Sequence, residues 1–575
     1  MPKKEPSKKN LALFSKNIDP IKFELIRNSL FFLVNEMALS LVRSSYSGIL
    51  RDNMDFSTGI ADRSGEMVAQ GLSLPLQFGP MPDAIAAVSK RWGKNMNKGD
   101  VFILNDPFEG GTHLPDVFFI KPIFINKKLF CFVCVCGHQI DVGGRVAGSN
   151  ASDSREIFAE GIRIPPLKLI DAGKQNETLI SIIEKNVRLP VNLFGDFRAH
   201  IAALKTGENG IYELIKKYTT KELIKYFKEL LDNAERITRN AISKIPDGVY
   251  KFTDYMDCDG VELNKVPIKV EVQINGDSVI VDTSGSSKQV QGAINSTYSM
   301  TKAVSYFAIR SIIEDDMPNN GGFFRPIKVI AEEGSIMKST IPAASGARGV
   351  TLLRLGDAVL GALSKAVPKR VSAANEGGPT LYSFGGYDST KNPFIFVEIF
   401  GGSWGGRPNK DGIDGIGHPL CNQRNIPVEF IEMEYPLRIN GYGYVPDSGG
   451  AGQYRGGLAL FREFKYIGDT PCQLQIRSDR SYTPPYGLHN GENGSLSKNI
   501  LNPGTNKEKV LPPMVTFILN PDEVVRFIIP GAGGWGKPEN RKLENLLYDI
   551  KNGYLTERYA RKKYKDVLLD SNTKH

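Results

Sequence analysis

Residues 104–148 constrain the fold of this 575-residue chain more than any other part of the sequence. Two apolar, β-rich runs, Val117–Phe124 and Leu129–Cys136, lie on either side of the polar tripeptide Asn126-Lys127-Lys128. A pair of such runs separated by a short polar turn is typical of an antiparallel β-hairpin. The sequence therefore predicts a hairpin with glycine-rich, polar segments at its open end.

Two copies of the pattern H-x-x-D lie at this open end, and a turn centred between residues 126 and 127 brings them together. It places Asp116 opposite Gly137, so that His113 and Asp116 meet His138 and Asp141. Facing Cα atoms in such a pair are roughly 4.5–5.5 Å apart. The side chains could then share one metal ion at about 2.0–2.2 Å from each ligand atom. A site of imidazole and carboxylate ligands suits zinc, manganese or iron(II). The alternative is that the histidines are loop residues that cap the strand ends, and the residue types alone leave both interpretations open.

Composition narrows the class of protein. The chain is 41% hydrophobic and 23% charged, which is typical of a globular protein with two to four domains. The net charge of +9 is spread along the chain, apart from the basic N-terminal run MPKKEPSKKN. No nucleic-acid-binding motif accompanies that run, so we expect no nucleic-acid partner. No signal-peptide pattern and no run of 18 apolar residues is apparent, which predicts a cytoplasmic protein without a membrane span.

The cysteines indicate reduced thiols. The spacing of the six residues suits neither a disulfide framework nor a zinc ribbon. Strand alternation places Cys134 and Cys136 on the same face of the predicted hairpin. The six are Cys131, Cys134, Cys136, Cys258, Cys421 and Cys472.

The pattern of elements predicts a mixed α+β fold, with an N-terminal α/β metal-binding part built on the hairpin and a β-rich, Gly-rich C-terminal part. Asp19 and Pro20 are typical of a helix start, and apolar residues at spacings of three and four continue that helix to about Ser45. The expected divisions are a flexible basic tail at 1–18, the metal-site region at 19–245, a mixed middle region at 246–374, the β-rich region at 375–541 and a helical extension at 542–575.

Several shorter segments carry weaker predictions. We expect a helix over Ser152–Glu160, a strand over Val428–Tyr435 and an anion-binding turn at residues 346–349. His200 is expected on the surface of a helix. A cluster of acids at strand ends could bind a cation, but we expect it to be solvated; its members are Asp254, Asp257 and Asp259.

Three segments resemble the signature sequences of the hydantoinase B/oxoprolinase family: NDPFEGGTHLPD, GHQIDVGG and EGIRIPPLK. The similarity runs from about Asp19 to about Arg541. The family includes B subunits of ATP-dependent N-methylhydantoinases, the C-terminal half of 5-oxoprolinases, caprolactamase B subunits and the metal-bearing subunit of acetone carboxylases. The resemblance thus implies a metal-dependent subunit of a larger enzyme.

The resemblance also implies roles for further residues. It makes Asp55 a candidate metal ligand or general base, although a cap or a buried ion pair remains an alternative. Asp141 is a second candidate base, or a residue that orients a ligand histidine. Gln77 stands where the family usually has histidine, and glutamine does not shuttle protons near neutral pH. The candidate substrate-binding residues are Gln77, Asn105, Asp106 and Gly144.

The function that follows from the resemblance is that of the B subunit of an ATP-dependent cyclic-amide hydrolase. An A-type partner subunit would use ATP to phosphorylate a hydantoin, 5-oxoproline or lactam, and this chain would complete the hydrolysis at its divalent metal. The sequence contains no G-x-x-x-x-G-K-[ST] phosphate loop, which agrees with that division and with a hetero-oligomer. The alternatives are an acetone carboxylase-like subunit and a non-catalytic, metal-stabilised scaffold.

Overall fold

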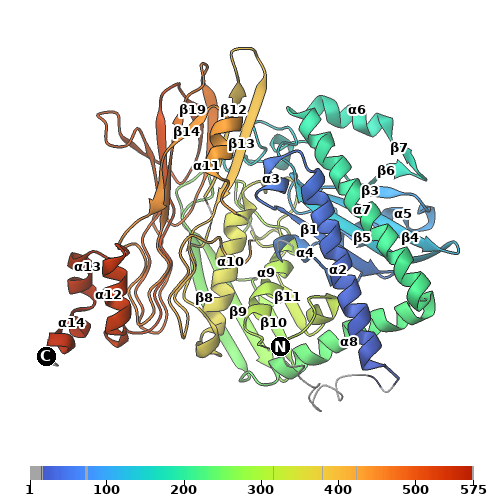
Figure 1. The fold of residues 1–575 in the computed structure, drawn as a ribbon, viewed down its shortest axis with the longest axis horizontal. Coiled ribbons are helices and arrows are strands. Elements are labelled where there is room, and N and C mark those ends of the chain that lie inside the picture. Colours follow the sequence, from blue (N-terminus) through green and yellow to red (C-terminus); the bar gives the residue numbers. More distant parts are fainter. Residues whose placement is uncertain are drawn as a thin grey trace.

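The computed structural model describes residues 15, 17–71, 75–314, 316–378, 380–421 and 424–572. Within this part of the chain, four β-sheets and the helices packed against them form the mixed α+β fold that the sequence predicts (Figure 1). The tail predicted at 1–18 lies almost entirely outside the described residues.

The N-terminal sheet has seven strands in the order β2-β1-β5-β4-β3-β6-β7, and every neighbouring pair is antiparallel. The hairpin β4–β5 lies near its centre and pairs with β1 through β5. The strands are β1 Phe56–Asp62, β2 Met67–Gln70, β3 Val101–Leu104, β4 Asp116–Ile125, β5 Lys128–His138, β6 Leu167–Asp171 and β7 Lys174–Gln175.

The hairpin forms as predicted, but its register differs by one residue at the open end. Asn126 and Lys127 both have positive φ, as a two-residue type I′ turn requires. A β-bulge follows, because Ile123 faces Cys131 whereas Phe124 faces Leu129. Asp116 therefore lies opposite His138 rather than Gly137.

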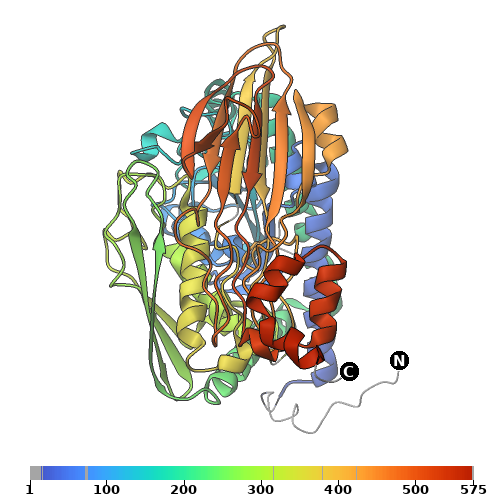
Figure 2. The same ribbon diagram turned by 90° about the vertical axis from the view of Figure 1, so that its left-hand side faces the viewer.

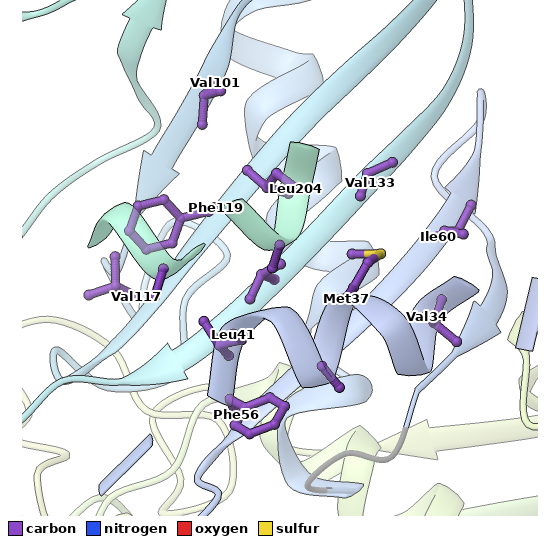
Figure 3. Close-up of a cluster of buried hydrophobic side chains, with 14 of the residues drawn as sticks. Val34, Met37, Leu41, Phe56, Ile60, Val101, Val117, Phe119, Val133 and Leu204 are labelled. Carbon is purple, nitrogen blue, oxygen red and sulfur yellow. The ribbon is translucent and has the colours of Figure 1, made fainter. Parts of the chain in front are cut away.

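Helices cover both faces of this sheet. Helices α2 (Pro20–Ser44) and α7 (Pro190–Tyr218) pack side by side on one face, and α5 (Met81–Trp92) covers the other (Figure 1). Figure 3 shows side chains of α2, α7 and the strands meeting in the first of these layers. Both faces of β4 and β5 are buried, which explains why these strands read as continuous apolar runs.

Helix α2 begins where the sequence predicts. The Asp19 carboxylate accepts hydrogen bonds from the Ile21 and Lys22 amides, and Pro20 is the first helical residue. This is a helix long and apolar enough, by length and composition, to cross a membrane. Its apolar stripe is packed in the protein core: Phe23, Ile26, Leu30, Leu33, Val34, Met37, Ala38 and Leu41 are buried.

The middle region consists of a four-stranded sheet with helices packed against it. The order is β11-β10-β9-β8, and only the β10–β11 pair is parallel. Helix α10 packs on β8, β9 and α9 and is almost entirely buried. The elements are α8 Thr220–Ile242, β8 Gly248–Met256, β9 Val266–Asn275, β10 Ser278–Asp282, α9 Tyr298–Ser311, β11 Ile327–Ile330 and α10 Arg348–Leu363.

The C-terminal region is β-rich, as the sequence predicts. Its two sheets share one aromatic core, in which the Tyr382 ring stacks on Phe527 at 4.3 Å between centroids. One sheet contains β12 Thr380–Tyr387, β13 Pro393–Phe400, β16 Cys472–Arg477 and β19 Met514–Leu519. The other contains β14 Leu437–Tyr444, β15 Leu460–Tyr466, β17 Lys498–Leu501, β18 Lys509–Leu511 and β20 Val524–Ile528.

Three short helices follow these sheets and lie at their lower end in Figure 2. They are α12 Leu543–Lys551, α13 Glu557–Lys563 and α14 Lys565–Asn572. The remaining short helices are α3 Gly48–Arg51, α4 Pro75–Phe78, α6 Glu177–Asn186 and α11 Val428–Glu434, and the 3-10 turns are η1 Gly93–Asn95, η2 Ile157–Ala159, η3 Gly321–Phe324, η4 Pro368–Arg370 and η5 Pro538–Asn540.

Two predicted elements are wrong. Val428–Tyr435 is not a strand but the helix α11, which buries Ile431 in the C-terminal core while its glutamates point outward. Ser152–Glu160 is not a helix, apart from the single turn η2. Long-range backbone bonds hold that segment instead, from Ala293 N to Ser152 O and from Ile157 N to Pro342 O.

The acidic cluster predicted to be solvated is buried. Asp254 is 5% exposed, and its carboxylate pairs with Arg480 at 3.1 Å and Arg354 at 3.4 Å. The cysteines are free thiols as expected, and five of the six are buried while Cys421 is partly exposed.

Candidate metal centre

Three of the predicted ligands converge at the open end of the hairpin. Asp116 is the first residue of β4, His138 is the last of β5, and His113 lies in the loop just before β4. Nε2 of His113 and Nδ1 of His138 are 3.2 Å apart, and Oδ1 of Asp116 is 3.3 Å from the first and 3.2 Å from the second. All three side chains are buried.

This triangle has the dimensions of a metal site. Ligand atoms at about 2.0 Å from a tetrahedral ion are about 3.3 Å from one another, which matches the observed edges. The donors are two nitrogens and one oxygen, a set that suits zinc, manganese or iron(II). Three ligands from the protein would leave a further coordination position for a small molecule, which is the arrangement of catalytic rather than structural sites.

Two neighbours determine which oxygen of Asp116 faces the histidines. Oδ2 accepts hydrogen bonds from Oγ1 of Thr112 and from a terminal nitrogen of Arg348, both at 2.6 Å. Oδ1 is left to face the two rings. Partners of this kind commonly orient metal ligands and adjust their basicity.

The pKa values of His113 and Asp116 favour metal binding near neutral pH. Burial, together with the positive charge of Arg348, lowers the pKa of His113 to about 3, so its ring is neutral at pH 7. Burial opposes ionisation of Asp116, but His113 and Arg348 outweigh it and hold the pKa of that carboxyl well below its ordinary value. A neutral imidazole beside an ionised carboxylate is the protonation state in which these groups bind metals.

Asp55 and Gln77 lie beside the triangle. Asp55 immediately precedes β1, and its carbonyl oxygen accepts from the amide of His138 at 3.0 Å. Nε2 of Gln77 donates to Asp55 Oδ1 at 2.8 Å and approaches Asp116 Oδ1 at 3.3 Å. The Gln77 amide thus bridges the two carboxylates, and Asp55 is adjacent to the triangle but not one of its three corners.

The structure places Asp141 outside this group. Its carboxylate pairs with Arg188 at 2.9 Å and also accepts from the Arg188, Gly143 and Gly148 amides. These contacts tie the loop after β5 to the segment before α7.

The other predicted substrate-binding residues have structural contacts. Asn105 donates to the carbonyls of Leu114 and Ile162 and accepts from the Ile164 amide. Asp106 pairs with Arg163 at 3.1 Å. Gly144 has a φ of +82°, and a Cβ there would lie 2.6 Å from the backbone of Glu160. Of the four candidates, Gln77 is the one that contacts the group of site residues.

His200 was expected on a helix surface, and that prediction is wrong. It lies within α7 with no exposed surface, and its ring stacks on Phe119 at 4.5 Å between centroids. Burial lowers the pKa of His200 to about 4, so the ring is neutral at pH 7. Gly137 leaves room for it, because a Cβ at that position would lie 2.3 Å from His200 Nε2.

Sequence reasoning missed the residues that come from distant parts of the chain. Arg348 is 232 positions from Asp116, and the sequence predicts it only as part of an anion-binding turn. The first amides of that turn face a side chain of the protein: the Ser345 and Gly346 amides donate to the carboxyl oxygens of Glu160 at 2.9 and 2.7 Å. Arg477 and Cys421 had no distinguishing signal in the sequence.

Comparison with known proteins agrees with this geometry. The sequence profile of the Hydantoinase B/oxoprolinase family matches residues 19–538. The chain belongs to this family. It is 35% identical over 557 residues to an uncharacterized protein of Methanocaldococcus jannaschii, covering 96% of this chain and 97% of that one.

Two enzymes of known structure extend the comparison. The chain is 30% identical to the caprolactamase subunit beta of Pseudomonas jessenii, over 96% of this chain and 97% of that subunit. The crystal structure of the ATP-dependent caprolactamase from that organism superposes with a TM-score of 0.89 over 96% of both chains, at 28% identity. An acetone carboxylase structure superposes with a TM-score of 0.88 over 95% of this chain and 79% of that chain. At 18% identity, this second likeness is one of fold.

Membership of the hydantoinase B/oxoprolinase family makes this chain a B-type member of a group of cyclic-amide hydrolases. The predicted family and fold class are therefore confirmed.

Proposed function

We propose that this chain is the B subunit of an ATP-dependent cyclic-amide hydrolase and that His113, Asp116 and His138 hold its divalent metal. The observation that carries the proposal is the buried triangle of their ligand atoms, with edges of 3.2–3.3 Å. The family and the caprolactamase likeness support the substrate class of hydantoins, 5-oxoproline and lactams.

The reaction needs activation, because the nitrogen of an amide donates electron density into its carbonyl and makes the carbon a poor electrophile. We assign that step to an A-type partner subunit, which would phosphorylate the substrate oxygen with ATP. Two observations support this assignment: the sequence has no phosphate-loop pattern, and the similar caprolactamase chain is one subunit of an ATP-dependent enzyme.

The residues of this chain would then complete the hydrolysis. The oxygen of a water molecule forms a bond to the activated carbon, the ring C–N bond breaks, and the nitrogen gains a proton. A second water molecule then hydrolyses the acyl phosphate that remains, which releases the carboxylate and inorganic phosphate. We assign removal of the water proton to Asp55, whose carboxylate is positioned beside the triangle by Gln77. Thr112 and Arg348 keep Asp116 ionised and oriented. A bound divalent metal would supply Lewis acidity, which lowers the pKa of water and polarises a carbonyl.

The test begins with metal content. Elemental analysis of the purified protein should find about one divalent metal per chain, lost in the double variant His113→Ala/His138→Ala. The control is His489→Asn, which replaces an exposed histidine. The φ of His489 is +53°, and asparagine tolerates this left-handed backbone conformation. Wild-type protein that neither contains nor takes up metal would contradict the site.

Activity is tested next, after reconstitution with an A-type subunit. We expect ATP-dependent ring opening of a lactam, hydantoin or 5-oxoproline, and its loss in His113→Ala. Ring opening by this chain alone without ATP would contradict the partner assignment. Turnover of ATP that requires a ketone and bicarbonate would instead assign the chain to the carboxylase branch. Full activity in His113→Ala would mean that the metal site is not catalytic, and the chain would then be a non-catalytic scaffold.

A further inference from the structure

Arg477, the last residue of β16, differs from the other buried arginines. It is 4% exposed, yet it makes no ion pair with a carboxylate of the described residues. Its one hydrogen bond there runs from a terminal nitrogen to the carbonyl of Gly346 at 3.2 Å, and its Nε has no partner. The six other buried arginines each have a carboxylate partner: Arg348–Asp116, Arg354–Asp479, Arg455–Asp414, Arg462–Glu398, Arg480–Asp254 and Arg541–Asp411.

A buried charge without a partner is destabilising, because the protein replaces its hydration with too few compensating interactions. The surroundings of Arg477 increase this cost. Burial and the neighbouring positive charge of Arg348 lower the pKa of Arg477 to about 10, while Cys421 and Asp55 oppose that shift. The guanidinium therefore stays charged at pH 7, and the fold leaves that charge without a bound anion of its own.

Arg477 lies beside the metal centre. A terminal nitrogen of Arg477 would lie 3.5 Å from a Cβ at Gly349, the residue that follows Arg348, and Arg348 contacts Asp116. The carbonyl that Arg477 contacts, Gly346, belongs to the same turn from which α10 and Arg348 begin. An anion bound between the two arginines would thus lie next to the triangle of metal ligands.

A cavity lies near this region. It has a volume of about 820 Å³ and lies between α2, α9 and the loop that contains Pro419 and Cys421. Cys421 is partly exposed, and its thiol is near enough to Asp55 and Arg477 for both charges to change its pKa. Gly79 also lines the cavity and follows Gln77 by two residues. Cys421 and Gly79 therefore bring part of the cavity wall near the site residues.

We infer that Arg477, together with Arg348, forms an oxyanion-binding subsite beside the metal centre, which binds a phosphoryl or carboxylate group of the substrate. The planar guanidinium presents paired N–H donors that match the oxygens of both groups. The inference rests on the proposed function, in which a phosphorylated substrate reaches this chain. An anion there would supply the charge partner that the fold leaves out.

The test is isothermal titration calorimetry of inorganic phosphate, and separately of acetate, into the metal-depleted full-length chain. Removing the metal makes the result independent of whether the metal centre is catalytic, which metal analysis and ring-opening assays test separately. We expect phosphate or acetate to bind, and Arg477→Gln to weaken that binding at least about tenfold. Tighter binding of phosphate would identify the phosphoryl group as the ligand, and tighter binding of acetate the carboxylate.

The matched control is Arg310→Gln, which removes an arginine that lines the cavity and should leave binding unchanged. Arg477→Met should unfold at the wild-type temperature or above it, because it removes an unpaired buried charge. Absence of binding, equal binding by Arg477→Gln, or loss of binding in Arg310→Gln instead would overturn the inference. Arg477→Lys keeps the charge but not the planar guanidinium, so it should bind phosphate or acetate with intermediate affinity. It provides a second measurement of the role of Arg477 if the other variants fold poorly.

Discussion

Nε2 of His113 and Nδ1 of His138 face each other across 3.2 Å in a buried site, and Oδ1 of Asp116 faces both. The pKa of His113 is about 3, so its ring is neutral rather than positively charged at this contact at pH 7. Nδ1 of His113 and Nε2 of His138 have no hydrogen-bond partner in the part of the chain that the structure describes. The rings are therefore oriented mainly by packing and by what they face.

Metal removal should lower thermal stability. A ligand that binds only the folded state stabilises it by about 2.7 kcal/mol at a free concentration of one hundred times its Kd. The wild type should therefore melt several degrees higher with added Zn²⁺ or Mn²⁺ than after chelation, as measured by calorimetry. His138→Gln should show no such difference. Equal shifts in the two proteins would mean that the metal binds elsewhere.

Thr112→Val should weaken the metal site without unfolding the chain. The substitution keeps the shape of the side chain but removes the 2.6 Å hydrogen bond that orients Asp116. Loss of such a partner typically reduces metal affinity about 10–100-fold. Competition with a chromogenic chelator measures the affinity, and Thr112→Ser, which keeps the hydroxyl, is the control. Unchanged affinity in Thr112→Val would show that Arg348 alone orients the carboxylate.

Gln77→Leu should separate metal binding from catalysis. It removes the amide that links Asp55 to Asp116 and leaves the three predicted ligands in place. We expect kcat of the reconstituted complex to fall about 10–100-fold, in the range that positioned bases contribute, with metal content unchanged. The exposed Gln175→Leu serves as control. Loss of the metal in Gln77→Leu would instead assign Gln77 a role in ligation.

Glu160 should make stability depend on pH. Burial raises its pKa from an ordinary 4.5 to about 8, despite hydrogen bonds from Gly346 and Ser345. Between these two pH values the folded state holds a proton that the unfolded state has lost. The contribution of Glu160 to the free energy of unfolding is therefore fully present below about pH 4.5 and is lost as pH rises through 8. For this one proton, the free energy of unfolding changes by at most about 1.4 kcal/mol per pH unit. Urea unfolding at pH 6 and pH 8 should show a smaller loss in Glu160→Gln than in wild type.

The exposed Glu213→Gln is the control for that experiment and should keep the wild-type slope. An identical slope in Glu160→Gln and wild type would contradict the raised pKa of Glu160.

Gly137→Ala should destabilise the hairpin beside His138, because the added methyl would lie 2.3 Å from His200 Nε2. Overpacking of this kind typically costs about 1–3 kcal/mol. His200→Ala opens space at the same point, so the double variant should be more stable than the sum of the two single losses implies. Denaturant unfolding of all four proteins measures that coupling, and strict additivity would mean that the two residues do not interact.

Local sequence patterns were sufficient for the elements whose stability is local. The N-cap of Asp19, the apolar stripe of α2 and the turn between β4 and β5 were all predicted, because caps, helical spacing and turns act over a few residues. The bulge after Ile123 was not predicted, because the turn sets the register only for the pairs next to it, Ile125–Lys128 and Phe124–Leu129. That single shift changed the partner of Asp116 from Gly137 to His138.

The sequence by itself determined the family, the mixed α+β class and the hairpin that brings His113, Asp116 and His138 together. Only the tertiary structure decided what surrounds them. Arg348 lies 232 positions from Asp116, and Arg477 reaches the same region from another sheet. The cost of burying a charge depends on every group packed around it, and those groups come from segments that sequence spacing does not relate. For this reason the bridging role of Gln77, the pairing of Asp141 with Arg188 and the unpaired charge of Arg477 could be recognised only in the folded chain.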